Sequence, residues 1–330
     1  MSITIKDVAK AAGVSVATVS RVLNRSPAVS EKTAEQVHSA ISELGYSPNF
    51  LGRNLRKCET KKILAVIPSL EHSFYGEVLR GLREAALPDY DVIICSSYSN
   101  FDTEYRMLEM LFNRTADAAV LLGTRMTAEI LAELDSRYNI ALCCERVEGA
   151  KVLTVTIDDE KGAYDAVSAL IAKGHRRIGM INAAGTAFSS YDRENGYIKA
   201  LADNNIEFDE ALIYRGSYDF DDGGKGYSEL MKNSPAPTAL FCISDLLAAG
   251  AVHKAAECGM RAGKDIDIIG FDNTVISSIY IPGITTVAQP CYDMGYTAMK
   301  LLLDNMNSSD CNKEHIKLPH SIVPRESAEL

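Results

Sequence analysis

Apolar residues in the first 60 positions recur at helical spacing in three short stretches. A residue suited to a helix N-cap precedes each stretch, namely Thr4, Ser15 and Ser30. Gly13, the segment 24–27 and Gly45 follow as terminators. The positions expected to face inward are Ile5, Val8, Ala9 and Ala12, then Val16, Val19, Val22 and Leu23, then Ala34, Val37, Ile41 and Leu44. The pattern predicts three helices, although the β-branched residues of the second stretch would also suit a strand.

From residue 62 the pattern changes, because apolar runs of about five residues alternate with longer helical patterns. The predicted strands are 63–68, 91–96, 117–122, 140–144, 154–157, 177–182, 238–243 and 266–271. The predicted helices lie near 75–86, 102–113, 127–136, 160–173, 191–204 and 245–258. Continuous apolar strands separated by helices indicate parallel sheets covered on both faces. Two such blocks predict an α/β core of two doubly wound subdomains, with a ligand site in the cleft between them.

Composition places the chain among ordinary globular proteins, with 330 residues, 47% hydrophobic and 24% charged. We find neither an apolar run long enough to span a membrane nor a secretory leader at MSITIKDVAK, so a cytoplasmic location is expected. The eight cysteines form no C-x-x-C pair, which favours reduced thiols over disulfides or a metal site. No nucleotide-binding or hydrolase motif is present, and His175 is expected to be structural. The sequence thus predicts no enzyme activity, cofactor or metal.

The charges are unevenly distributed along the chain. Residues 1–60 carry eight basic and five acidic side chains, whereas the whole chain has a net charge of −10. The amino-terminal segment is therefore positive, at +3, and the remainder is strongly negative, at −13. Such an asymmetry predicts a small basic arm that meets an anion, joined to an acidic body that does not.

The first two predicted helices, with Gly13 at the turn between them, have the pattern of a helix-turn-helix. Another small three-helix bundle would share that pattern. However, TIKDVAKAAGVSVATVSRVLN, followed by Val29-Ser30, Gly45-Tyr46 and Pro48-Asn49, resembles the DNA-binding head of the lactose-repressor (LacI/GalR) family. The resemblance continues through Gly174-His175-Arg176-Arg177-Ile178, Gly270-Phe271-Asp272-Asn273, Thr285-Thr286-Val287, Gln289-Pro290 and Pro324-Arg325-Glu326-Ser327.

The resemblance implies four segments: a helix-turn-helix domain at 1–48 and a hinge helix with linker at 49–61, followed by a core like the periplasmic binding proteins. In that core, 62–158 plus 290–318 would form the N-subdomain and 159–289 plus 319–330 the C-subdomain. The core fold is shared with transport-type solute-binding proteins, which are the alternative interpretation. The basic head and the lack of a readable export signal favour a regulator.

The resemblance also assigns DNA contacts. Val16, Ala17 and Arg21 match positions that contact bases in the major groove, and Arg21 is able to donate two hydrogen bonds to one guanine. The residues expected to contact phosphates or to complete the interface are Thr4, Ser15, Thr18, Ser20, Asn24, Asn49 and Arg53. Leu55 matches the leucine that the family inserts into the minor groove, although 49–62 would also serve as a simple linker. Gly52 stands where the family usually has alanine, which disfavours the hinge helix.

For the cleft, the resemblance points to Phe74, Tyr75, Thr124, Glu145, Arg193, Tyr218, Ser244, Asp245 and Asp272. Aromatic faces and a few charged groups suit a sugar-like effector. Arg193 near a helix start opposes the helix dipole, so an anionic or polar partner is expected beside it. Truncating Arg193 or Asp272 is expected to abolish the ligand response with little loss of stability.

The function implied is a homodimeric repressor of carbohydrate genes. It would bind a pseudo-palindromic operator with an affinity that the effector changes. The tail shows no leucine heptads, so a dimer is expected rather than a tetramer.

Overall fold

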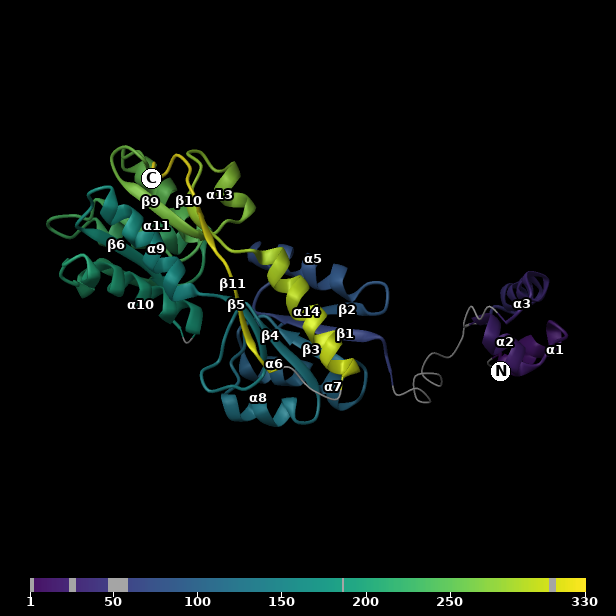
Figure 1. Cartoon of the computed structure of the whole chain (residues 1–330). Coiled ribbons are helices and arrows are strands. Elements are labelled where there is room, and N and C mark those ends of the chain that lie inside the picture. The colour runs from purple at the N-terminus through teal and green to yellow at the C-terminus, as the bar shows by residue number, and fades with distance from the viewer. Residues whose placement is uncertain (1–2, 24–27, 47–58, 186, 309–312) are drawn as a thin grey trace. The chain divides into compact units, whose positions relative to one another are not determined.

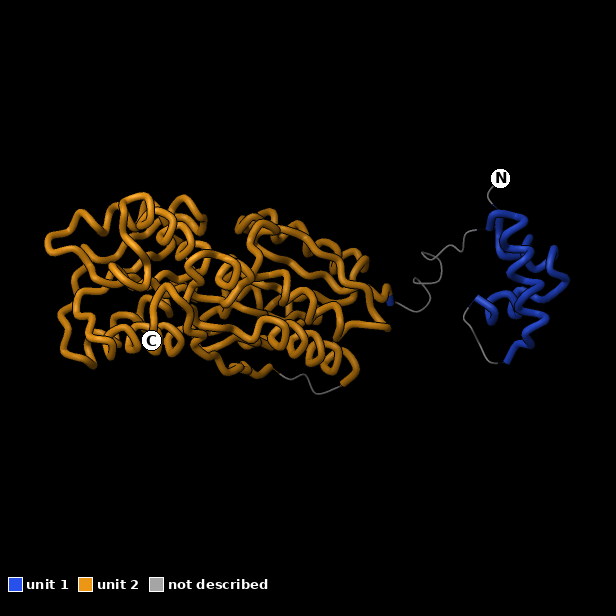
Figure 2. Tube along the Cα trace, turned by 90° about the horizontal axis from the view of Figure 1, so that it is seen from above, with its two compact units in different colours: residues 1–59 blue, residues 60–330 orange. Residues whose placement is uncertain are grey.

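The computed structural model describes residues 3–23, 28–46, 59–185, 187–308 and 313–330. The chain divides into two units, residues 1–59 and 60–330, coloured separately in Figure 2. The predicted DNA contacts Asn24, Asn49, Arg53 and Leu55, together with Gly52, lie outside the described residues.

The first unit contains the three predicted helices, α1 (Ile5–Ala11), α2 (Val16–Leu23) and α3 (Glu31–Leu44). The predicted caps are confirmed in α2 and α3, where the Ser15 and Ser30 hydroxyls accept hydrogen bonds from backbone amides three residues later. Gly45 ends α3 with a left-handed φ of 61°. The buried centre consists of Val8, Ala9, Val19, Val22, Val37 and Ala40.

Val16 does not belong to that centre, so its predicted inward orientation is wrong. Its side chain is 41% exposed at the first turn of α2. Val19 and Val22 alone supply the fully buried positions of this helix. The spacing from Val16 to Val19 is helical, but among the described residues the buried centre includes only Val19 and Val22 from α2.

The second unit is built on two six-stranded sheets (Figure 1). The first has the order β11-β5-β4-β3-β1-β2 and is parallel throughout. Its strands are β1 (Lys62–Ile67), β2 (Asp91–Ser96), β3 (Ala118–Leu121), β4 (Asn139–Cys143), β5 (Leu153–Ile157) and β11 (His315–Leu318). The helices of this part are α5 (Phe74–Ala86), α6 (Phe101–Met107), α7 (Glu109–Phe112), α8 (Ala128–Asp135) and α14 (Cys291–Asn307).

Alternate residues of β1 enter the two faces of this sheet, as a doubly covered parallel sheet requires. Ile63, Ala65 and Ile67 join one buried cluster with residues of α5 and α14. Leu64 and Val66 join another with residues of α6, α7 and α8. The helix predicted at 102–113 is interrupted at Leu108, which separates α6 from α7.

The second sheet has the order β12-β10-β9-β8-β6-β7. It is parallel except for the antiparallel edge strand β12. Its strands are β6 (Ile178–Ala183), β7 (Ile213–Gly216), β8 (Ala239–Cys242), β9 (Asp267–Asp272), β10 (Thr285–Ala288) and β12 (Ser321–Val323). Its helical elements are α9 (Asp159–Ala172), α10 (Phe188–Asp203), the 3-10 turn η1 (Glu210–Leu212), α11 (Phe220–Leu230), α12 (Asp245–Glu257) and α13 (Val275–Ile279).

The predicted pair of doubly wound subdomains is thus confirmed. The chain crosses between the sheets after β5, after β10 and between β11 and β12. The strands of each sheet fall within the predicted subdomain limits, which remain a proposed division. The carboxyl ends of β1, β3 and β4 in one sheet and of β6, β7 and β9 in the other precede the residues described next.

Candidate functional site

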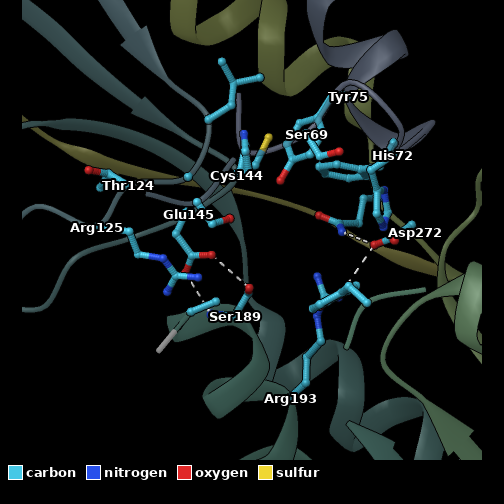
Figure 3. A pocket seen from close by; sticks show the side chains of 18 residues that line it. Ser69, His72, Tyr75, Thr124, Arg125, Cys144, Glu145, Ser189, Arg193 and Asp272 are labelled. Atoms are coloured by element: carbon cyan, nitrogen blue, oxygen red, sulfur yellow. Dashed lines mark hydrogen bonds and ion pairs between the residues drawn. The ribbon is translucent and has the colours of Figure 1, made fainter. Parts of the chain in front are cut away.

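A cavity of about 210 Å³ lies between the two subdomains (Figure 3). One water molecule needs roughly 10–15 Å³ of such space, so the cavity has room for a small organic molecule. Its walls come mainly from loops at the carboxyl ends of strands, where ligands of doubly wound sheets bind. The lining residues are Pro68, Ser69, His72, Phe74, Tyr75, Ser99, Leu122, Gly123, Thr124, Arg125, Cys144, Glu145, Ala187, Ser189, Arg193, Tyr218, Asp272 and Gln289.

Most of the residues predicted for the cleft come together here. The structure places seven of the nine on the wall of the cavity, namely Phe74, Tyr75, Thr124, Glu145, Arg193, Tyr218 and Asp272. The first four come from the first subdomain and the last three from the second. A molecule in the cavity would therefore contact both subdomains at once.

Ser244 and Asp245 do not line the cavity, so their assignment is corrected. The Ser244 hydroxyl caps α12 by accepting a hydrogen bond from the Leu247 amide at 3.2 Å. The Asp245 carboxylate accepts hydrogen bonds from the backbone amide and the hydroxyl of Thr274, at 2.6 and 2.9 Å. Both side chains are fully buried and hold α12 and the segment after β9 in place.

Arg193 is surrounded by partners within the protein. Its Nε donates to Asp159 Oδ1 at 2.9 Å, and its Nη1 donates to the Ile243 carbonyl at 2.6 Å and lies 3.7 Å from Asp272 Oδ1. Its guanidinium also covers the Phe271 ring, 3.7 Å from the ring centroid. The anionic partner predicted beside Arg193 is thus present, as the carboxylates of Asp159 and Asp272. Burial disfavours the charge, but the two carboxylates more than offset it and hold the Arg193 pKa above its ordinary value.

The carboxyl groups of the site are shifted by their burial. Burial raises the pKa of Asp159 and of Asp272 to about 6, against the opposing charge of Arg193. Gln289 Nε2 donates a hydrogen bond to Asp272 Oδ1 at 2.7 Å. Burial also raises the pKa of Glu145 to about 7, even though Ser189 donates two hydrogen bonds to it. Near neutral pH the cavity thus presents the Asp272 carboxylate as an acceptor and Glu145 in both its ionised and its protonated form.

His72 is a residue of the cavity that the sequence reading missed. Its ring makes edge contacts with Phe74, Tyr75 and Tyr218, with centroids 6.2, 5.9 and 5.8 Å away. Both ring nitrogens are buried, and neither has a hydrogen-bond partner among the residues that the structure describes. Burial lowers the His72 pKa to about 4, so the ring is neutral at physiological pH. A buried polar group without a partner is uncommon, and a ligand hydroxyl would satisfy it.

No pattern in the sequence distinguished His72, because a histidine in a loop carries no periodicity. The same holds for other polar lining residues that were missed: Ser69, Ser99, Arg125, Cys144, Ser189 and Gln289. Their positions in the segments that follow strands, or in the first turn of α10, were the available signal.

Polar contacts join the two subdomains beside the cavity. Glu145, after β4, accepts hydrogen bonds from the Ser189 amide at 2.8 Å and from its hydroxyl at 2.9 Å, at the start of α10. The next residue, Arg146, forms a two-pronged ion pair with Asp192 of α10, at 2.8 and 2.5 Å. The segment after β4 therefore both lines the cavity, through Glu145, and holds the two subdomains together.

The head presents its predicted DNA contacts on the surface of α2. Val16, Ala17 and Arg21 are exposed, as base contacts require, and Thr4 is exposed before α1. The hydroxyls of Ser15 and Thr18 lie 2.8 Å apart, and Ser20 is half-buried. Their contacts with DNA stay predictions.

Other features of the described residues have structural roles. His175, as predicted, is paired, with Thr238 Oγ1 at 2.8 Å from Nδ1 and Asp267 Oδ2 at 2.8 Å from Nε2. Within the described ranges, no three histidine, cysteine or carboxylate side chains gather as metal ligands. None of the helices that the structure describes has the length and apolar character needed to cross a lipid bilayer.

Two family models match the chain. Residues 4–49 match the bacterial regulatory proteins of the lacI family, and residues 167–328 match the periplasmic binding protein-like domain. Catabolite control protein A of Priestia megaterium is 35% identical, over 99% of both chains. The transcriptional repressor CytR of Escherichia coli K12 is 36% identical, over 92% of this chain and 89% of its own length.

Solved structures agree with these matches. The lac repressor dimer bound to operator and the anti-inducer ONPF superposes with a TM-score of 0.88 at 25% identity, over the whole of both chains. A complex of the transcriptional regulator CelR with cellobiose gives a TM-score of 0.75 at 29% identity, over 99% of this chain and 100% of the other. With relatives of this similarity over nearly its full length, the chain belongs to the lacI family of bacterial transcriptional regulators.

Proposed function

We propose that this protein is a cytoplasmic, homodimeric repressor of carbohydrate-metabolism genes. It binds a pseudo-palindromic operator through two heads, and a sugar-like effector in the cavity changes its affinity for that operator. Neither the proposed effector response nor the proposed DNA contacts require a cofactor or a metal. The cytoplasmic location follows from the proposed target, which is the chromosomal DNA.

The observation that carries the proposal is the chemistry of the cavity. Phe74, Tyr75 and Tyr218 offer ring surfaces for the C–H faces of a sugar. Asp272 and Glu145 offer hydrogen-bond acceptors, and the unpaired His72 nitrogens require a partner. A neutral polyol meets all of these needs, since each hydroxyl both donates and accepts hydrogen bonds.

The head supports the proposed DNA contacts. Val16 and Ala17 are exposed apolar side chains at the start of α2, suited to a thymine methyl group, and Arg21 on the same helix suits a guanine. The remaining proposed contacts are Thr4, Ser15, Thr18 and Ser20, together with Asn24, Asn49, Arg53 and Leu55 outside the described residues.

The proposed homodimer is supported by exposed apolar side chains in the first subdomain. Ile94, Tyr98, Phe101 and Tyr105 are all exposed and lie within twelve positions of one another, on the edge strand β2, the following loop and α6. Large apolar side chains that gather in this way are typical of protein interaction surfaces. Sedimentation at micromolar protein concentration should give a dimer, and a monomer would contradict this part of the proposal.

A thermal-shift titration with neutral sugars tests the effector site. At least one sugar should raise the unfolding temperature, because a ligand that binds only the native state stabilises it. His72→Phe keeps an aromatic ring but removes both nitrogens, so it should weaken the shift, whereas His253→Phe, at an exposed position of α12, should not. Equal shifts in the wild type and His72→Phe would place the ligand elsewhere.

A further inference from the structure

Two adjacent cysteines end strand β4 beside the cavity. Cys143 is fully buried, while Cys144 is half-buried and lines the cavity (Figure 3). Consecutive residues of a strand normally point to opposite faces. Cys144 has a φ of 68°, in the left-handed region that is uncommon for residues other than glycine. The alternation ends at this point, and the two sulfur atoms lie 3.5 Å apart.

The distance between the two sulfur atoms can be compared with the distances that a disulfide, a bent bridging atom and a linear ion would require. A direct disulfide suits Cα atoms about 4.4–6.8 Å apart, whereas neighbouring residues hold theirs at about 3.8 Å. One bridging atom with sulfur bonds of about 2.3 Å separates the sulfurs by about 3.5–3.8 Å at bond angles near tetrahedral. A linear two-coordinate ion with the same bonds would need about 4.6 Å. The observed 3.5 Å, at which the two thiols form a weak S–H···S contact, also fits a single bridging atom with bent geometry.

Cys291 lies near this pair, but the described residues supply no complete three-ligand site. Among the described residues, no group of three metal-ligating side chains includes this pair. The bridging atom must therefore bring its own third substituent. A trivalent arsenic atom that carries one organic group has this composition and a pyramidal geometry.

We propose that the Cys143 and Cys144 thiols form a binding site for organic trivalent arsenicals, which reach it through the cavity. With an arsine oxide, the two S–H bonds and the As=O bond break and two As–S bonds form. The oxygen leaves with both thiol protons as one water, and no oxidant or reductant is consumed. Burial raises the pKa of the Cys144 thiol, so it enters this reaction protonated.

Cys291 is the alternative partner. It begins α14 and lies near enough to the pair that Cys291 contributes to the raised pKa of Cys144 and Cys143 to the raised pKa of Cys291, after burial in both cases. The experiment must therefore separate a Cys143–Cys144 pair from a pair that includes Cys291.

Phenylarsine oxide provides the test on the native full-length protein. After a wash with excess 2-mercaptoethanol, intact-mass analysis should show one phenylarsenic group per chain, because a chelate of two thiols resists a monothiol. The dithiol 2,3-dimercaptopropanol should remove it. Cys144→Ser should abolish retention, whereas Cys291→Ser and Cys258→Ser, the latter at an exposed position, should retain the group.

Retention by Cys144→Ser, loss in Cys291→Ser, or no retention by the wild type would overturn the assignment. Access is tested with a phenylarsenical attached to agarose beads, which are too large for the cavity. The beads should capture the chain unfolded in urea but not the native protein. Equal capture of the native protein would show that the thiols are reached from outside the cavity.

Discussion

At the scale of the residue, Arg21 allows base recognition to be separated from phosphate binding. Arg21→Ala should relax specificity at one base pair of each half-site and cost about 1–3 kcal/mol per contact. The exposed Lys10 on α1 supplies the matched control, Lys10→Ala. The affinities of Arg21→Ala and Lys10→Ala are measured on a set of operators that differ at single base pairs. A uniform loss across all sequences would instead identify Arg21 as a phosphate contact.

The structure changes the expectation for Arg193. Sequence reasoning expected Arg193→Ala to keep the stability of the protein, but Arg193 pairs with Asp159 and Asp272 in the interior. Its removal leaves buried carboxylates without compensation, which costs about 3–5 kcal/mol. Arg215→Ala removes a more exposed ion pair with Glu194 and should cost at most about 1 kcal/mol. Urea unfolding measures the free energy of unfolding of the two variants. Equal decreases in Arg193→Ala and Arg215→Ala would contradict the buried cluster of charges.

Glu145 should make stability depend on pH. Its pKa is about 7 in the native state, compared with an ordinary value of 4.5. Between these values the native state holds a proton that the unfolded chain has released, so the free energy of unfolding falls as the pH rises through this window. Glu145→Gln cannot titrate, and its stability should fall less steeply from pH 4.5 to 7.

Urea unfolding at several pH values measures this difference. Glu207→Gln, at an exposed position, is the control and should keep the slope of the wild type. If the slope of Glu145→Gln were also unchanged, the carboxyl group would not be the one that titrates in this window.

At the scale of the element, α5 and α14 approach each other through reciprocal glycines. A Cβ at Gly81 would lie 2.1 Å from the Tyr292 carbonyl oxygen, and one at Gly295 would lie 2.0 Å from that of Val78. Gly295→Ala should therefore separate the helices and cost about 1–3 kcal/mol. Gly76→Ala on α5 meets nothing within 4 Å and should stabilise the helix by about 0.5–1 kcal/mol. Denaturant unfolding of both variants measures the change in the free energy of unfolding. An unchanged free energy of unfolding in Gly295→Ala would contradict the close packing.

The same kind of packing explains which elements the sequence could not predict. The eight strands with continuous apolar runs were located to within about two residues, because burial on both faces, which seven of them have and the edge strand β2 lacks, leaves a strong pattern. Helix α11 was missed because it contains Gly223 and Gly226, which weaken helix propensity. A Cβ at Gly223 would lie 2.1 Å from the Leu247 carbonyl oxygen, so the contact with α12 requires glycine there.

The candidate site was predictable in part for a similar reason. Asp272 ends β9 and Glu145 lies two residues after β4, and the family resemblance pointed to both. Ser244 occupies an equivalent position after β8, but its hydroxyl turns back to cap α12. Whether a side chain turns into the cavity or into its own helix depends on hydrogen bonds that spacing does not reveal.

At the scale of the whole molecule, we assign effector binding to one unit and DNA binding to the other. Residues 60–330 contain both sheets and the cavity, and residues 1–59 carry the exposed face of α2. A ligand that contacts both subdomains favours one arrangement of the cleft over another, and only such a difference in affinity shifts a population. The ion pair of Arg146 with Asp192 and the hydrogen bonds of Glu145 with Ser189 are among the described contacts that such a shift would change.

The central claim is that a sugar in the cavity changes the affinity for operator DNA. The most direct measurement is the affinity of the full-length protein for its operator, with and without a sugar identified by thermal shift. An allosteric coupling of about 1–3 kcal/mol predicts a change of about 5- to 150-fold in either direction. The fragment 60–330 should bind the same sugar but not the operator. If the sugar binds in the cavity and the operator affinity stays the same, the account is contradicted.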